Sequence, residues 1–415
     1  MRLLAIFLTA ALLSICSCSA ASGNPDYDKY FTGERLRLDF MLAGDDVNLD
    51  AFLVKVRKEC EWAGSPNSLI DPFGYGELRF EAYSGETLVY STGMCPLFLE
   101  WTTTAEASKV AKAMSNTVWM PFPKEEITVR LFRRQKADGS LKEIFSCSID
   151  PKDALIERSP ENSFEVVTLR KSGDNRHKVD LLYVAEGYTA DEMDKFQADC
   201  KRFTDYLFSM APYKDRKDDF NVRAVLSVSE DSGTTIPNRD EWKNTVLKSN
   251  FYTFYTDRYL TVLDHSLIAS AVSNAPFDAV FVIANESKYG GGGFYNSYGL
   301  GTADNELSEV VFVHEFGHSF AGLGDEYYTS EVAYEDYYNL KLEPWEPNIT
   351  TLVDFGSKWK DMKDSGKAGL FEGGGYMAKG IYRPAEDCRM KSNTPPDFCP
   401  VCQRAISRMI DFYCK

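Results

Sequence analysis

Histidine is scarce in this chain: only four occur among 415 residues, namely His177, His265, His314 and His318. Imidazole is the commonest metal-binding side chain, and it titrates close to neutral pH. A site that uses imidazoles must therefore be built from these four residues. Two of them stand four positions apart. None follows His318, so a third histidine ligand from the downstream side is excluded.

Blocks of lysine and arginine are also absent. The chain has 46 basic and 62 acidic residues, a net charge of -16 and a pI of about 4.9. Proteins that bind nucleic acid normally present a clustered basic face, so we expect no nucleic-acid partner. The acidic excess is typical of a surface that keeps a folded protein soluble.

Long hydrophobic runs are missing beyond the first residues, since no later segment reaches about 18 consecutive apolar positions. Near the start, Arg2 is followed by an apolar run over residues 3–15 and then by small residues and two cysteines. This pattern is typical of a secretory signal. Cys18 resembles a bacterial lipobox cysteine better than Cys16 does, because small Ser17 precedes it and Ile15 lies three positions back.

We therefore expect residues 1–18 to be a lipoprotein-type signal peptide. Lipid on Cys18 would anchor the protein to a membrane without a transmembrane helix. The protein would then face the periplasm or the cell surface. Ordinary signal cleavage near Ala20 or Ala21 is the alternative.

The length of the chain favours two domains. Residues 19–30 are small and polar, which predicts a tether. In residues 31–160 apolar and polar side chains alternate, as at Leu36, Leu38 and Phe40, and this favours an antiparallel β-sandwich-like domain. In residues 165–415 buried-strand patterns alternate with helical ones, which predicts an α/β domain.

The motif His314-Glu315-Phe316-Gly317-His318 carries the strongest chemical signal. On a helix, side chains four positions apart share one face, so the two imidazoles can bind one Zn²⁺. Glu315 lies next to that face, where it can take a proton from a water molecule. Apolar residues before the motif indicate that the helix is buried.

The segment after the motif offers a third ligand. Gly322 can end the helix by adopting left-handed backbone angles, and the chain then returns with Asp325 or Glu326. A helix that stops and brings back a ligand is the arrangement of the metzincins. The usual glycine and histidine positions of that motif fall on Ala321 and Gly324 here, so the ligand becomes a carboxylate. We favour Asp325, which is nearest to the expected return point.

The sequence HEFGHSFAGLGDEYY at 314–328 resembles the zinc motif of the bacterial IgA-peptidase family of metallopeptidases. Residues 178–189, 219–222 and 388–390 are also similar to that family, and the first 160 residues resemble its β-rich N-terminal domain more loosely. The resemblance implies a zinc peptidase with His314 and His318 as ligands and Asp325 as the third. It also implies that Glu315 is the catalytic acid/base.

Metzincin-like sites rest on a methionine turn beneath the metal. Two candidates exist, and we favour Met390, in Cys388-Arg389-Met390, over Met377. Four tyrosines are candidate hydrogen-bond donors to the oxyanion: Tyr327, Tyr328, Tyr376 and Tyr382. Four consecutive glycines at 290–293 could form a sheet edge that accepts a substrate strand or a flexible loop.

Ten cysteines occur, eight of them after Cys18. The pair Cys399-Pro-Val-Cys402, with Cys388 and Cys414, could bind a structural zinc ion. Disulfides are the favoured interpretation, because an exported protein meets an oxidising environment.

The function that these features predict is hydrolysis of peptide bonds, in a protein or peptide substrate, by an exported zinc endopeptidase. A lipid-anchored surface protein that binds a glycan or protein ligand, and whose zinc is purely structural, is the main alternative. Hydrolysis of another amide, such as one on a glycan, is the third.

Overall fold

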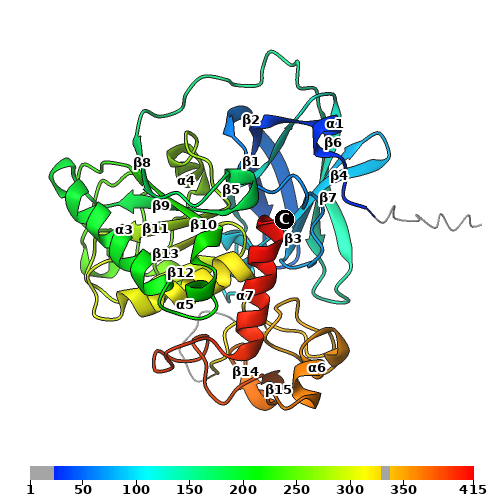
Figure 1. Cartoon of the computed structure of the whole chain (residues 1–415), viewed down its shortest axis with the longest axis vertical. Coiled ribbons are helices and arrows are strands. Elements are labelled where there is room, and N and C mark those ends of the chain that lie inside the picture. The colour runs from blue at the N-terminus through cyan, green and yellow to red at the C-terminus, as the bar shows by residue number, and fades with distance from the viewer. Residues whose placement is uncertain (1–22, 329–336) are drawn as a thin grey trace, which may run out of the picture.

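The computed structural model describes residues 23–328 and 337–415. The predicted signal peptide, residues 1–18, and the lipid attachment at Cys18 lie outside the described residues. Within the described ranges, no helix has both the length and the apolar character needed to cross a membrane. The chain folds into two regions, each with its own sheets (Figure 1).

The first region consists of two antiparallel sheets that share one hydrophobic core. The first sheet has the order β2-β1-β5, with β1 at Phe31–Gly44, β2 at Leu49–Glu61 and β5 at Lys112–Pro123. The second has the order β4-β3-β6-β7, with β3 at Leu78–Ser84, β4 at Thr87–Met94, β6 at Ile127–Arg134 and β7 at Leu141–Ile149. A short helix, α2 (Leu97–Trp101), follows β4.

Strand β1 is buried on both faces. The predicted alternation holds, because Leu36, Leu38 and Phe40 point into the core between the sheets. Between them, Arg35 is also buried: it pairs with Glu59 at 2.7 Å and donates to backbone carbonyl oxygens of the second region. A buried guanidinium needs such partners, so this face of β1 attaches the first region to the second.

The folded part begins earlier than the sequence predicted. Residues 24–30 were expected within a tether, but Tyr27–Tyr30 form the short helix α1. Tyr27 is buried against Trp62, with ring centroids 5.5 Å apart. Asn24 accepts a hydrogen bond from the backbone of Leu69. The tether interpretation is therefore wrong for these residues, because their aromatic and amide side chains belong to the first region.

A long connection leads to the second region, which is built on a mixed six-stranded sheet of order β12-β13-β11-β9-β10-β8. The central strands β9, β10, β11 and β13 are parallel, whereas β8 and β12 at the edges are antiparallel to their neighbours. The bounds are β8 Glu165–Arg170, β9 Val179–Glu186, β10 Phe220–Leu226, β11 Ala279–Ala284, β12 Gly291–Phe294 and β13 Tyr298–Thr302.

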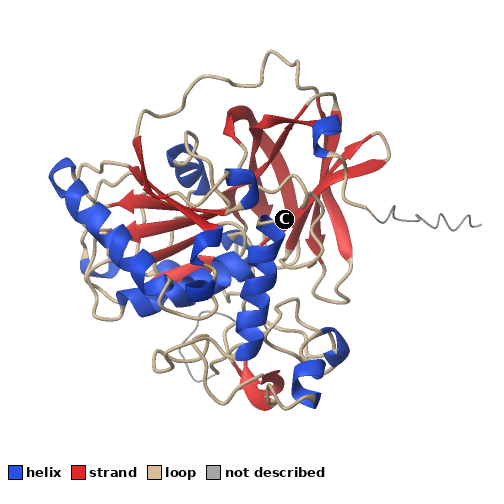
Figure 2. Ribbon diagram, in the orientation of Figure 1, coloured by secondary structure: helices blue, strands red, loops and turns tan. Residues whose placement is uncertain are grey.

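Both faces of this sheet are covered (Figure 2). Alternate residues of β9 enter two different cores: Leu181 and Tyr183 pack towards one, Leu182 and Val184 towards the other. This explains why β9 reads as a continuous apolar run. The first core includes the helices α3 (Met193–Leu207), α5 (Ser308–Ala321) and α7 (Pro400–Tyr413); the second includes α4 (His265–Ala271).

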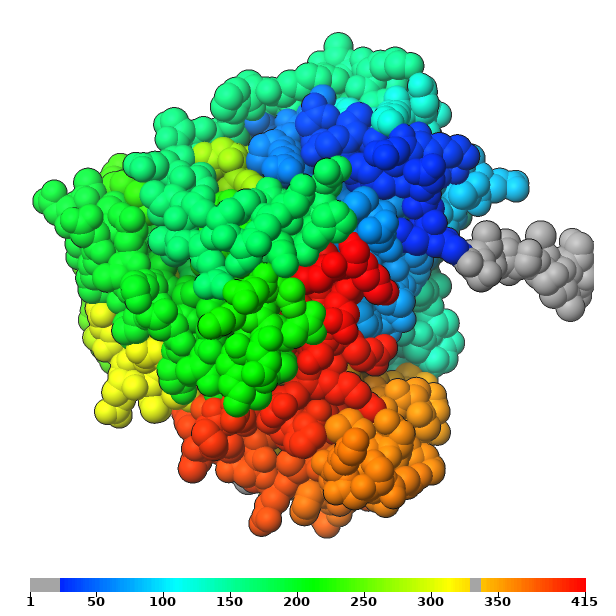
Figure 3. Space-filling view, viewed as in Figure 1, coloured from blue at the N-terminus to red at the C-terminus, as the bar shows by residue number. Residues whose placement is uncertain are grey.

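Between α5 and α7 the chain forms a smaller lobe with helix α6 (Lys360–Asp364) and the hairpin of β14 (Phe371–Gly374) and β15 (Met377–Arg383). Helix α7 then returns to the body of the molecule. Its end contacts the first region, where Ser65 and Asn67 donate hydrogen bonds to the Lys415 carbonyl oxygen at 3.0 and 3.1 Å. Figure 3 shows this C-terminal segment, in red, filling the space between the two regions.

Candidate metal centre

Helix α5 carries the His314–His318 motif and ends where the sequence predicted. Gly322 adopts a left-handed conformation with φ of 64°, and its amide bonds to the His318 carbonyl oxygen at 3.0 Å. The Leu323 amide bonds to the Gly317 carbonyl oxygen at 3.2 Å. This pair of bonds is a Schellman-type end, and it reverses the chain so that residues 323–326 pass beside the helix.

Three side-chain atoms converge at this point. The Nε2 atoms of His314 and His318 lie 3.1 Å apart, and Asp325 Oδ1 lies 3.1 Å and 3.3 Å from them. A tetrahedral zinc ion bound at about 2.0–2.1 Å keeps its donor atoms about 3.3 Å apart. The triangle formed by His314, His318 and Asp325 therefore has the dimensions of one face of a zinc coordination sphere.

The hydrogen bonds of the two imidazoles show why a cation would bind at this triangle. His314 Nδ1 lies 3.0 Å from the Arg389 carbonyl oxygen, and His318 Nδ1 contacts that of Leu323. Because a carbonyl oxygen only accepts, each Nδ1 carries the proton and each Nε2 presents a lone pair. Asp325 Oδ1 is buried without a hydrogen-bond partner. Three lone pairs thus face one point, and the donor set fits a zinc ion.

Asp325 is held in place by its surroundings. Its other carboxylate oxygen accepts a hydrogen bond from the Tyr376 hydroxyl at 2.5 Å, and its carbonyl oxygen accepts one from Gly375 at 2.8 Å. Burial alone would raise the pKa of Asp325, but the two imidazoles hold it well below its usual value. The carboxylate therefore stays ionised, as a metal ligand must.

The electrostatic effect is reciprocal at His318. Burial lowers the pKa of this imidazole, but Asp325, together with Glu315 and the Leu323 carbonyl oxygen, outweighs burial and raises the pKa to about 9. Without a metal, a proton consequently competes for the same lone pair.

Glu315 is the second carboxylate near the imidazoles. Its carboxylate lies within 4.8 Å of the ligand atoms of His314 and His318, so it is geometrically a rival third donor. Asp325 is the better candidate for the third ligand, because its Oδ1 lies 3.1 Å and 3.3 Å from the two Nε2 atoms and its other oxygen is fixed by Tyr376. Burial raises the pKa of Glu315, which suits a group that accepts and returns a proton.

These residues line a cavity of about 450 Å³. Tyr327 and Tyr376 also line it, whereas Tyr328 packs against Gly373 and Tyr382 pairs with Thr350. A second cavity of about 360 Å³ adjoins the first, and the two share Trp345 and Glu346 in their walls. The space beside the metal-binding triangle thus extends towards the first region.

Three of the four consecutive glycines, residues 291–293, lie in the edge strand β12 and not in a flexible loop. A Cβ atom on Gly293 would lie 2.3 Å from the Glu315 carbonyl oxygen, and one on Gly291 would lie 3.1 Å from Glu315 Cγ. Both glycines therefore permit helix α5 to approach the sheet closely. The segment at Tyr259 forms an isolated bridge to Gly291 on the outer side of β12.

Met390 lies directly beneath the motif helix. It is fully buried, and its sulfur would be 2.9 Å from a Cβ atom placed on Gly317. The preceding residue, Arg389, supplies the carbonyl oxygen that orients His314. The other candidate, Met377, lies in the hairpin strand β15.

The cysteines differ from the favoured expectation. All eight in the described residues are free thiols, so the structure contains no disulfide among residues 23–328 and 337–415. Cys388, Cys399 and Cys402 do lie together, but Cys414 does not join them: its thiol faces the Asp219 carbonyl oxygen at 3.7 Å. Glu326 takes the fourth place in the group.

His177 contacts the Lys415 carbonyl oxygen and His265 contacts the Ser297 hydroxyl, both away from the cavity. The sequence also gave no sign of Arg258, which lines the cavity with its guanidinium 6.0 Å from the Tyr327 ring centroid. It comes from a loop far from the motif, and no local pattern marks it.

The chain matches two family models. IgA Peptidase M64 covers residues 167–368 and 359–410, and Peptidase M64 N-terminus covers residues 26–146. The chain belongs to the IgA peptidase M64 family. This confirms the resemblance drawn from residues 314–328, and it makes the protein a peptidase with a protein or peptide substrate. No curated protein matches the chain.

The two matches divide this M64 peptidase as the structure does, into a region of antiparallel sheets and a region with the mixed sheet and helix α5. Peptidases of this family are metal-dependent in general, and the described residues contain two groups of side chains that could hold a metal ion. Family membership does not favour a binding module without catalytic activity.

Proposed function

We propose that this M64 peptidase is a zinc-dependent endopeptidase whose metal is bound by His314, His318 and Asp325. The observation that carries the proposal is the buried triangle of three lone-pair donors, 3.1–3.3 Å on each side. Two imidazoles and one carboxylate are a zinc donor set, and three protein ligands leave a fourth position for water or substrate. A closed four-ligand site would instead indicate a structural ion.

Bound zinc would supply polarisation of the scissile carbonyl and a lower pKa for the attacking water. The chain supplies the rest. Glu315 takes the proton from the attacking water and delivers it to the leaving amine. Its raised pKa keeps it able to act in both directions. Arg258 and Tyr327, which line the same cavity, are the groups that we assign to binding the substrate carbonyl.

The arrangement is metzincin-like in its order of parts: a motif helix, a glycine turn, a returning ligand and a methionine beneath. The third ligand is a carboxylate in place of the usual histidine. We also propose that the antiparallel sheets of the first region form a β-sandwich, and that strand β12 positions an extended substrate beside Glu315. The adjoining cavities provide space for residues on both sides of the scissile bond, as an endopeptidase requires.

The decisive experiment compares wild type with Glu315→Gln and His318→Ala. We expect Glu315→Gln to keep its zinc and lose peptidase activity by a factor of about 10²–10⁴, because general acid–base catalysis contributes that much. His318→Ala should lose both zinc and activity. The mechanism is wrong if Glu315→Gln cleaves peptides as fast as wild type does. Cleavage of a glycan amide in preference to peptides would overturn the peptidase assignment.

Export and lipid anchoring form a separate proposal, supported by the sequence of residues 1–21. Expression of the full chain in a bacterium with lipoprotein processing should place it in the membrane fraction. Cys18→Ala should release it to the soluble fraction. Equal membrane association of the two forms would contradict a lipid anchor on Cys18.

A further inference from the structure

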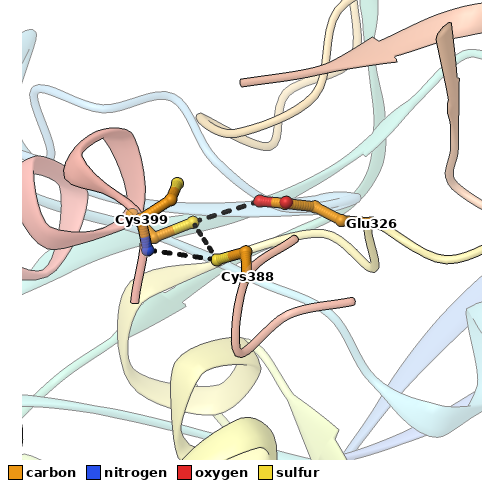
Figure 4. Close-up of side chains that lie close together, drawn as sticks. Glu326, Cys388 and Cys399 are labelled. Carbon is orange, nitrogen blue, oxygen red and sulfur yellow. Dashed lines mark hydrogen bonds between the residues drawn. The ribbon is translucent and has the colours of Figure 1, made fainter. Parts of the chain in front are cut away.

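A second group of metal-binding side chains lies behind the candidate active site. It consists of Glu326, Cys388, Cys399 and Cys402, whose ligand atoms all lie within 4.8 Å of one another. All four residues are buried. Figure 4 shows Glu326, Cys388 and Cys399 close together, with Glu326 in the segment after α5, Cys388 in the turn that precedes Met390, and Cys399 at the start of α7.

The distances within the group suit a tetrahedral ion. Cys388 Sγ lies 3.8 Å from Cys402 Sγ, and Cys402 Sγ lies 3.3 Å from Glu326 Oε1. Zinc binds thiolate sulfur at about 2.3 Å and carboxylate oxygen at about 2.0–2.2 Å, which puts neighbouring donors about 3.5–3.8 Å apart. Two residues separate Cys399 from Cys402, the spacing that structural zinc sites commonly use.

The carboxyl group of Glu326 is buried with one oxygen unpaired, which favours a bound cation. The residue has no exposed surface, and although Asn348 donates to Oε1 at 2.9 Å, Oε2 has no hydrogen-bond partner. A buried polar atom without a partner destabilises the fold, so a bound cation would be favoured here.

A disulfide would not resolve the cluster. It would consume two of the three thiols and leave the third beside an unpartnered carboxyl group. Cys414 lies at the other end of α7, where it faces the Asp219 carbonyl oxygen. By contrast, one divalent cation satisfies all four donors together. Cys399 and Cys402 lie at the N-terminus of α7, and the Cys399 amide donates to Cys388 Sγ at 3.2 Å.

We propose that Glu326, Cys388, Cys399 and Cys402 bind a second zinc ion whose role is structural. Four protein donors close the coordination sphere, so no position remains for a reacting water. The ion would join three segments that are distant in sequence: the segment after α5, the turn at 388–390, and α7.

These segments also position the candidate catalytic site. Glu326 follows Asp325 directly, and its amide bonds to the Met390 carbonyl oxygen at 2.8 Å. Arg389, next to Cys388, orients His314. The second ion would therefore fix the third ligand and the orientation of one imidazole. Only this positioning role rests on the proposed function; binding of the ion does not.

The first test measures metal in the full chain, isolated without added reductant. We expect about two zinc ions per chain in wild type and about one in the double variant His314→Ala/His318→Ala, held by the cysteine cluster. The double variant leaves every cysteine intact, so the result does not depend on whether a cysteine variant folds. A double variant that retains no zinc would overturn the proposal.

The second test replaces zinc with Co²⁺, which gives a near-ultraviolet charge-transfer band only where thiolates are bound. The band should appear in wild type and in His314→Ala/His318→Ala. It should vanish in Cys399→Ser/Cys402→Ser and weaken or shift in Glu326→Gln. Cys414→Ser is the matched control, because it removes a thiol from the other end of α7 and should leave the band unchanged.

The outcomes separate the two proposals. A thiolate band without peptidase activity would support the second site and contradict the proposed function. The reverse result would be peptidase activity with one zinc per chain and no thiolate band, with two thiols missing from a titration under denaturing conditions because they form a disulfide. That result would support the proposed function and contradict the second site. All eight cysteines of the described residues should titrate as free thiols once the metal is removed.

Discussion

The close approach of strand β12 to helix α5 gives a sharp test of how the site is built. Gly293→Ala adds one methyl group on the face of β12 that meets the helix. The new Cβ atom would lie 2.3 Å from the Glu315 carbonyl oxygen and 2.8 Å from His318 Cβ. Both neighbours belong to the rigid motif helix, so no flexible side chain can move away.

The size of the disturbance follows from these distances. Real Cβ atoms essentially never approach another heavy atom within 3.0 Å. Raising 2.3 Å to 3.0 Å requires the strand and helix to separate by at least 0.7 Å. Overpacking of this kind costs about 1–3 kcal/mol of stability. The same shift moves His318 relative to Asp325, whose donor atoms now lie 3.3 Å apart.

Because Asp325 is held by Tyr376 and Gly375 and cannot follow the helix, we expect weaker metal binding as well as lower stability. Disturbing the support of a metal ligand typically weakens binding 10–100-fold, and a misplacement near 1 Å can lower catalysis about 10²-fold. Competition with a chelator measures the zinc affinity, and kcat/KM for a peptide measures the effect on catalysis.

Gly301→Ala is the matched control. It also adds a methyl group to a strand of the same sheet, but its Cβ atom would meet Phe281 at an ordinary 3.4 Å. This variant should bind zinc and cleave peptides as wild type does. If Gly293→Ala matches Gly301→Ala in zinc affinity, the packing of β12 does not position the motif helix and the reasoning is refuted.

Three further predictions concern the groups around the site. Tyr376→Phe removes the hydrogen bond to Asp325 and should weaken zinc binding by about tenfold without unfolding the protein. Competition with a chelator measures the zinc affinity, and circular dichroism checks the fold. Unchanged affinity would show that Tyr376 does not hold Asp325 in position for the metal. Because the pKa of His318 is raised to about 9, a proton must leave the imidazole when the metal binds. The apparent zinc affinity should therefore fall about tenfold for each pH unit as the pH is lowered from 8.5 to 6.5. A zinc affinity that does not change with pH would contradict this prediction. Burial raises the pKa of Glu346 to about 7, so its carboxyl group stabilises the fold fully below its unfolded pKa of about 4.5, and this stability is lost as pH rises through 7. The difference in unfolding free energy between wild type and Glu346→Gln should therefore fall by about 3 kcal/mol over that range in denaturant titrations, and a constant difference would refute the prediction.

The parts of the site that the sequence predicts are those encoded by local spacing. The separation of His314 and His318 places both on one helix face, and Gly322 supplies the left-handed residue that turns the chain back. Each inference needs only a few neighbouring residues and a known backbone preference. The alternation in β1 and the apolar run of β9 are local signals of the same kind, and both elements form as expected.

The parts that the sequence does not reveal depend on distant contacts. Arg389 orients His314 from 75 residues away, and Tyr376 holds Asp325 from 51 residues away. Neither a carbonyl oxygen nor a tyrosine hydroxyl leaves a pattern that marks its partner. The glycines of β12 are visible in the sequence, but their reason is the approach of α5, which only the packed sheet and helix show.

Asp325 and Glu326 illustrate the same limit most directly. The sequence presents them as rivals for one ligand position, because adjacent carboxylates cannot be told apart by spacing alone. In the structure the side chains of the two acids contact different groups. Asp325 faces the two imidazoles and Glu326 faces the cysteines. The two acids therefore belong to the two different proposed sites, and the single peptide bond between them is the shortest physical link by which a disturbance of the cysteine cluster would reach the proposed third ligand.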